Sequence, residues 1–79
     1  MYHIKVKVVE HLANGTDKVL NEATWTSQYG DTKMPSLFVK QSVMELTGER
    51  TTVDISSANW RMDSKDGRYS WIATWEPYI

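Results

Sequence analysis

Two Asx-Gly pairs, Asn14-Gly15 and Asp66-Gly67, constrain this 79-residue chain more than any other feature, because each lies between segments of alternating hydrophobicity. Alternation of apolar and polar residues is typical of a half-buried strand. An Asn-Gly or Asp-Gly pair favours a two-residue type I′ turn between two such strands. The chain is therefore predicted to form two β-hairpins, one near each end.

The first hairpin is predicted over residues 2–26. A two-residue turn sets its register by pairing residues whose numbers sum to 29. Lys7 then faces Glu22, and Val9 faces Leu20, so unlike charges meet and apolar side chains meet, as cross-strand pairing favours. A slip of one residue would undo all of these pairs together.

The second hairpin is predicted over residues 51–76. A two-residue turn pairs residues whose numbers sum to 133, and a four-residue loop at 64–67 is the alternative that shifts the partners by two. Upstream, the apolar alternation changes phase, which predicts a bulge or a break at Ser56-Ser57. With either turn the same side chains face the core: Ala58, Trp60, Met62, Tyr69, Trp71, Ala73 and Trp75.

One helix is predicted between the hairpins, at residues 35–47. Pro35 suits a first helical turn, Ser36 is a capping residue, and Gly48 suits the position after the last turn. One apolar stripe of this helix should pack on the sheet, and the second is either covered by a loop or left exposed as a binding face. The two stripes are Leu37, Phe38 and Met44, and Val39, Val43 and Leu46.

These elements predict an α+β fold of order ββαββ, with a four-stranded antiparallel sheet and one helix packed on one face, in a single domain spanning residues 1–79. Hydrophobic residues make up 41% of the chain and charged residues 24%, which is typical of a globular protein. No segment resembles a signal peptide or a membrane span, and cysteine is absent. We therefore expect a cytoplasmic protein that does not bind membranes.

No catalytic, cofactor or metal motif is found, which predicts a protein that is not an enzyme. His3 and His11 are separated by eight strand residues, about 27 Å at ~3.4 Å per residue, which is too far to share one ion. Asp63 and Asp66 flank the second turn, where aspartate is a preferred turn residue. No Gly-x-Ser-x-Gly elbow marks a serine nucleophile.

The sequence is compatible with two kinds of binding module, a protein-binding module and, as the alternative, a nucleic-acid-binding module. The alternative is a small module that uses the basic outer face of the sheet, predicted to carry Lys5, Lys7, Lys18 and Arg61. Acidic residues share that face, and the tryptophans are expected to point inward rather than to stack on bases. The net charge of −1 also gives no basic footprint.

The first hypothesis is a protein-binding module. Unpaired sheet edges could pair with a partner strand or with a second copy of the chain, so both a monomer and a homodimer are open. The residues expected to contact a partner are Lys5, Lys7, Tyr29, Asp31, Arg61 and Tyr78.

The alternating start Met1 to Val9, the helix Pro35 to Thr47 and the closing hairpin from Thr51 together resemble small phage and mobile-element inhibitor proteins of the anti-CRISPR type. The resemblance lies in the architecture of the whole chain and in no motif, so it implies no role for any single residue. It implies a phage- or prophage-encoded inhibitor that occupies a surface of a host protein or ribonucleoprotein complex, such as a defence or nuclease complex, without chemistry.

Overall fold

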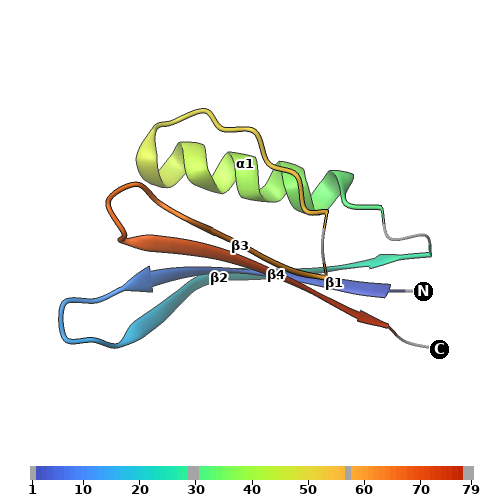
Figure 1. Cartoon of the computed structure of the whole chain (residues 1–79), viewed down its shortest axis with the longest axis horizontal. Coiled ribbons are helices and arrows are strands. Elements are labelled where there is room, and N and C mark those ends of the chain that lie inside the picture. Colours follow the sequence, from blue (N-terminus) through green and yellow to red (C-terminus); the bar gives the residue numbers. More distant parts are fainter. Residues whose placement is uncertain (1, 29–30, 57, 78–79) are drawn as a thin grey trace.

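The computed structural model describes residues 2–28, 31–56 and 58–77. It contains four strands and one helix, in the order β1 (Tyr2–His11), β2 (Asp17–Ser27), α1 (Lys33–Thr47), β3 (Asn59–Asp63) and β4 (Tyr69–Pro77). The strands form one antiparallel sheet of order β2-β1-β4-β3, and α1 covers one face of it (Figure 1). The predicted α+β architecture is confirmed.

The turn between β1 and β2 differs from the predicted two-residue turn. The Gly15 amide donates to the Leu12 carbonyl (3.1 Å) and the Leu12 amide donates to the Thr16 carbonyl (2.9 Å), which leaves a three-residue loop. Gly15 has a φ of 85°, whereas no described non-glycine residue has a positive φ. A type I′ turn needs positive φ at Asn14 as well, so that prediction is wrong. The Asn14 side chain instead accepts the Thr16 amide and hydroxyl, at 3.1 and 2.6 Å.

A β-bulge at Leu20 corrects the register for this longer turn. From Tyr2 to Val8 the strands pair as predicted, and Lys7 faces Glu22. The register then shifts between Val8 and Val9, so Val9 faces Val19 and the predicted pair with Leu20 is wrong. Leu20 is the extra residue on β2, and the bulge and the turn compensate each other.

The β3–β4 register is as predicted, with Met62 opposite Trp71 and Asp63 opposite Ser70. The closing turn is neither predicted form, because the Ser64 amide donates to the Tyr69 carbonyl (2.9 Å) across a four-residue loop at 65–68. This loop and the predicted two-residue turn are both centred between residues 66 and 67, so the β3–β4 register is the same for both.

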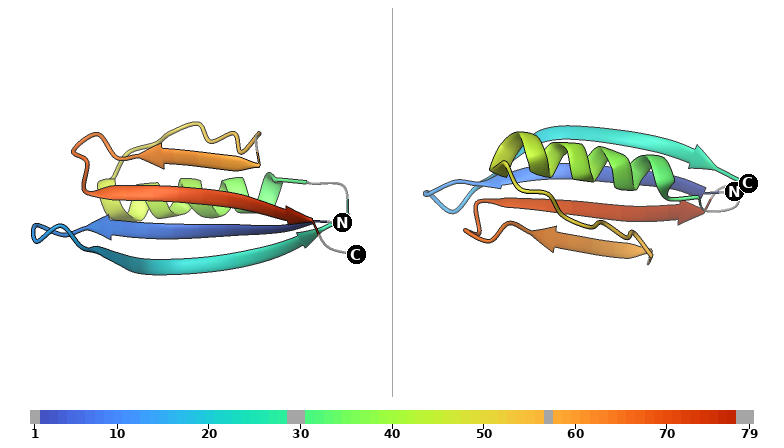
Figure 2. Two further views of the ribbon diagram at one scale, coloured as in Figure 1. Left: turned by 60° about the horizontal axis from the view of Figure 1, so that its bottom comes forward. Right: turned by 90° about the horizontal axis from the view of Figure 1, so that it is seen from above.

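The chain between the helix and β3 is not a strand, so the second hairpin is shorter than predicted. β3 begins at Asn59, and Ala58 is exposed rather than part of the core as predicted. Ile55 is completely buried, which confirms that the apolar pattern breaks before β3, although Ser57 itself lies outside the described residues. Figure 2 shows the segment 49–56 running back beside α1 towards β3.

The helix begins at Lys33, two residues before the prediction, and ends where predicted. Ser36 lies inside the helix and its amide donates to the Thr32 carbonyl (2.9 Å), so it is not the cap. Asp31 accepts the Lys33 amide (3.0 Å), which satisfies one of the free amides at this end. Gly48 has a φ of 73° and its amide donates to the Met44 carbonyl (2.9 Å), which is the left-handed cap that favours glycine.

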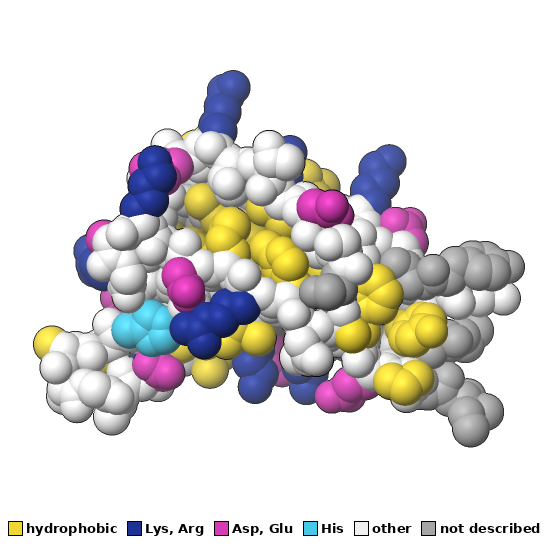
Figure 3. All heavy atoms as spheres, in the orientation of Figure 1, with side chains coloured by type: hydrophobic (Ala, Val, Ile, Leu, Met, Phe, Trp, Pro, Cys, Tyr) yellow, Lys and Arg dark blue, Asp and Glu magenta, His cyan; other side chains and the backbone are white. Residues whose placement is uncertain are grey.

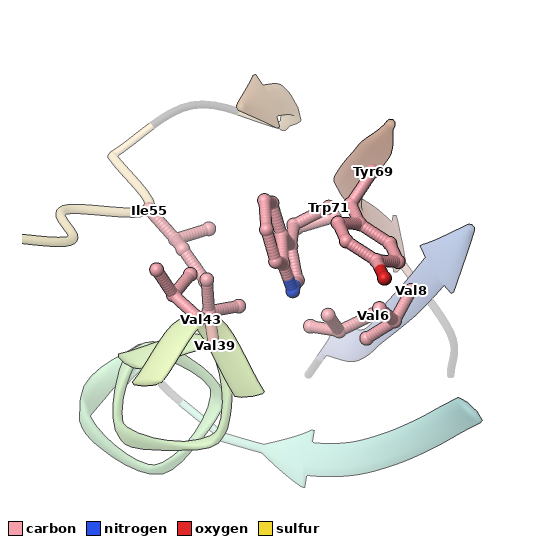
Figure 4. Close-up of a cluster of buried hydrophobic side chains, with 8 residues drawn as sticks. Val6, Val8, Val39, Val43, Ile55, Tyr69 and Trp71 are labelled. Atoms are coloured by element: carbon pink, nitrogen blue, oxygen red, sulfur yellow. The ribbon is translucent and has the colours of Figure 1, made fainter. Parts of the chain in front are cut away.

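The hydrophobic core lies between the helix and the sheet (Figure 4). Trp71 is completely buried, and its indole Nε1 donates to the Ser42 hydroxyl of α1 (3.0 Å). The other three tryptophans are half-buried and pack around this centre. The buried cluster consists of Val6, Val8, Val39, Val43, Ile55, Tyr69, Trp71 and Ala73.

Candidate functional site

A chain of hydrogen bonds crosses all four strands on the face of the sheet opposite α1. His11 Nδ1 contacts Asp17 Oδ1 (2.7 Å), and His11 Nε2 contacts Ser70 Oγ (2.7 Å). The Ser70 hydroxyl donates to Asp63, which also accepts from Arg61 Nε (3.0 Å). These side chains come from β2, β1, β4 and β3 in that order, so they link neighbouring strands; we call them the polar chain.

The contacts from Ser70 to His11 and from His11 to Asp17 follow the order Ser-His-Asp of a serine hydrolase triad, but the proton positions differ. The hydrogen bond from Ser70 and then that from Arg61 hold the pKa of Asp63 below its usual value of 3.8, so this carboxylate is ionised and can only accept. Ser70 gives its single proton to Asp63, and His11 Nε2 must then donate to Ser70. A general base does the reverse, and Ser70 is 0% exposed. The polar chain therefore joins strands and leaves no accessible nucleophile at Ser70.

Sequence reasoning missed the polar chain for two reasons. Ser70 and His11 lie 59 residues apart, and only the strand order brings β4 beside β1. His11 faces Asp17 because of the β-bulge, since the predicted register pairs His11 with Lys18. No local pattern in the sequence signals either contact.

The cations predicted on the outer sheet face are interspersed with acids. Lys5 pairs with Glu22 (3.7 Å), and Arg61 pairs with Asp63. Lys7 is exposed in the same row of the sheet as Arg61, with Ile72 between them.

The placement of Lys18 on that basic face is wrong. The β-bulge puts Lys18 opposite Glu10, and Glu10 has the same parity along β1 as the buried residues Val6 and Val8. Because side chains alternate along a strand, Lys18 lies on the α1 side of the sheet.

The structure does not bring the predicted partner-binding residues into one site. Asp31 is occupied in ordering the helix start, since its amide also donates to the Ser27 hydroxyl (2.6 Å). Lys5, Lys7 and Arg61 lie on the outer sheet face. Tyr29 and Tyr78 lie outside the described residues.

The exposed side of α1 carries an apolar stripe, so the second predicted stripe is partly exposed rather than covered by a loop. Met34, Leu37 and Met44 are 57%, 44% and 40% exposed. Phe38 instead packs edge-on against Trp25, with ring centroids 5.3 Å apart. The stripe borders a groove of about 730 Å³, which we call the helix groove, lined by Leu37, Lys40, Gln41, Met44, Glu45, Arg50, Thr51 and Thr52.

The helix groove and the adjoining flank of α1 carry cations that the described residues do not neutralise. Within the described ranges, no carboxylate comes within ion-pair distance of Lys33, Lys40 or Arg50. Lys33 and Lys40 are seven residues apart and share one flank of the helix, whereas Glu45 lies on the other flank. The groove thus combines an apolar stripe with two oppositely charged flanks.

A second hollow of about 420 Å³ lies between the end of α1 and the β3–β4 hairpin. Hydrophobic side chains are visible on this side of the molecule in Figure 3. Its floor includes Val43, Tyr69 and Trp71, which are core side chains, and the ion pair between Lys65 and Glu49 (3.5 Å) joins residues of its rim. We interpret this hollow as an incompletely filled margin of the core.

No family model, no curated protein and no solved structure matches this chain. Among the residues that the structure describes, no three side chains of histidine, cysteine, aspartate or glutamate come together in a group that could hold a metal ion. In the same residues, no helix has the length and apolar character needed to cross a membrane.

Proposed function

We propose that this chain is a non-enzymatic protein-binding module, and that the exposed apolar stripe of α1 is its interface. Scattered exposed apolar residues are normal, but three large ones lie here along one face of a single helix. The flexible methionine side chains can adapt to the shape of a partner. The helix groove beside them can receive side chains of that partner.

The rest of the molecule supports binding rather than chemistry. Ser70 is buried, and its hydroxyl donates a hydrogen bond to Asp63. The outer-face carboxylates Asp17 and Asp63 accept hydrogen bonds from His11 and Ser70 on neighbouring strands, which suits a scaffold. In finer terms, we propose a phage- or prophage-encoded inhibitor that acts in the cytoplasm on a host defence or nuclease complex, supported by the architectural resemblance and the absence of cysteine.

The nucleic-acid alternative has less support. Two of its four basic residues, Lys5 and Arg61, pair with acids, and Lys18 lies on the other face. A salt titration with single-stranded and duplex oligonucleotides tests it, because phosphate contacts weaken steeply as salt rises.

Site-specific photo-crosslinking in cells of the natural source tests the proposed interface. A benzophenone amino acid replaces Leu37 or Met44, with exposed Thr24 on the outer sheet face as the matched control position. We expect Leu37 and Met44 to give the same protein adduct, and Thr24 to give none. Adducts only from Thr24, or no protein adduct from any position, would contradict the proposal.

A further inference from the structure

We infer that the partner of the α1 interface is a second copy of this chain, and that the two α1 helices pack in parallel. This inference rests on the proposed function, because it names the partner of the same surface. Three features of α1 carry it: the spacing of the exposed side chains, the charges on the two flanks, and the single polar residue in the stripe.

The exposed side chains of α1 have the spacing of a coiled-coil seam. Met34, Leu37, Gln41 and Met44 follow one another at intervals of three, four and three residues, which are the intervals between a and d positions of a heptad. All four are exposed, and at 100° per residue they lie on the side of α1 opposite its buried residues Pro35, Val39 and Val43. They extend over about 15 Å of helix at 1.5 Å per residue, so a second helix can lie along them for almost three turns.

The flanking charges of this heptad are complementary to those of an identical helix. With Met34 at position a, Lys40 occupies a g position and Glu45 the next e position. In a parallel pair, each g side chain lies beside the e side chain of the following heptad in the partner. Lys40 would therefore meet the partner's Glu45, and symmetry forms this ion pair twice. Arg50 lines the same groove as Lys40 and adds a second cation there.

The same charges disfavour an antiparallel pair. An antiparallel arrangement places each flank against the identical flank of the partner, so Lys33 and Lys40 would face lysines. Gln41 also favours the parallel arrangement, because a polar side chain at an a position then meets its own copy and fixes the register. The two amides can each donate and accept a hydrogen bond.

Disulfide trapping with the purified chain tests the parallel register. The chain contains no cysteine, so Gln41→Cys introduces one thiol per copy. Paired a positions bring the two thiols within bridging distance, and mild oxidation should convert most of the protein to a covalent dimer. Thr24→Cys on the outer sheet face is the matched control and should stay largely monomeric. Equal slow dimerisation of both variants would overturn the inference.

A charge swap tests the ion pair itself, with sedimentation equilibrium as the measurement. Lys40→Glu and Glu45→Lys should each weaken dimerisation about tenfold or more, and the double variant should regain most of the wild-type affinity. Circular dichroism checks that each variant keeps its fold. A wild-type chain that stays monomeric up to about 100 µM, or a double variant as weak as the singles, would overturn the inference. A monomeric chain that still crosslinks to another protein through Leu37 overturns it too, and leaves the proposed function intact.

Discussion

Trp71 lies at the point where β4, the helix and the segment after the helix meet (Figure 4). Its ring fills the space between the valines of β1 and the side chains of α1, and its Nε1 is satisfied by Ser42. Because the indole is completely buried, both its area and its hydrogen bond depend on the packed state.

Trp71→Ala is expected to prevent stable folding. Removing a buried tryptophan side chain costs about 3–5 kcal/mol, and a domain of this size has a total stability of about 3–5 kcal/mol. Far-UV circular dichroism during urea titration should show no cooperative transition. Trp60→Phe is the control, since Trp60 is only half-buried and should keep a transition at lower urea. A Trp71→Ala transition near the wild-type midpoint would contradict this account of the core.

The lowered pKa of Asp63 makes the free energy of unfolding depend on pH. Its pKa is lower in the folded protein than the usual 3.8, first because Ser70 donates a hydrogen bond and second because Arg61 does. A depressed folded pKa adds stability above the unfolded pKa, and this stability is lost as the pH falls through the folded value. Asp63→Asn should therefore unfold at lower urea than the wild type at pH 7, and the difference should shrink below about pH 3.8.

Exposed Asp54→Asn provides the control for this measurement, because it removes a carboxylate that is not part of the polar chain. Its urea midpoint should differ little from the wild type at pH 7. A difference between Asp63→Asn and the wild type that stays constant, or grows, as the pH falls below 3.8 would show that the ionised carboxylate is not the stabilising group.

The elements show which parts of the structure local sequence determines. The pairing of β3 with β4, the β1–β2 register up to Val8 and the helix end at Gly48 were all predictable, because each depends on nearby alternation or on a residue needing positive φ. The turn types were not, because the Asn14 and Asp66 side chains bond to residues just beyond the glycine. Those contacts stabilise longer loops than the dipeptides alone suggest.

The β-bulge could not be predicted, and it decides where the charged groups lie. Leu20 has no local feature that marks it as an extra residue, since an apolar residue fits the predicted alternation as well. Its insertion moves Lys18 to the helix side and brings Asp17 beside His11. The wrong placement of Lys18 and the missed contact between His11 and Asp17 are therefore two results of one inserted residue.

Deleting Leu20 tests the role of the bulge in β2, which is an edge strand. The deletion should leave the turn and the pairs on both sides in place, because it removes only the extra residue. A regular edge strand is a better template for pairing with other chains, so dynamic light scattering should show more association than in the wild type. Leu20→Thr removes the same apolar side chain and keeps the bulge, and should not associate more. Equal association of the two variants would mean that the bulge does not protect this edge.

At the scale of the whole molecule, the two terminal strands form the centre of the sheet. β1 and β4 are neighbours, with Tyr2 opposite Pro77, and each also pairs with the strand of its own hairpin. Neither hairpin alone contains this pairing, and a two-stranded hairpin is barely stable in water. Folding therefore depends on contacts between residues 59 to 75 positions apart, which is why hairpin patterns did not predict the strand order.

The same arrangement predicts that a circular permutant will fold faster than the natural chain. A short glycine-serine linker from residue 79 to residue 1 turns the central β4–β1 pair into a local hairpin, and new ends in the exposed segment 48–50 after α1 keep both natural hairpins local. Lower average sequence separation between contacting residues speeds folding, so stopped-flow refolding should be several-fold faster.

A matched control keeps that experiment specific to the β4–β1 pair. Inserting the same linker into the 13–15 turn of the natural chain lengthens a loop that is already local, and should slow refolding slightly. Because the permutant keeps the β1–β2 and β3–β4 hairpins local, the β4–β1 pair is the strand pair whose sequence separation changes. A permutant that refolds no faster than the natural chain would show that formation of the central pair is not the slow step.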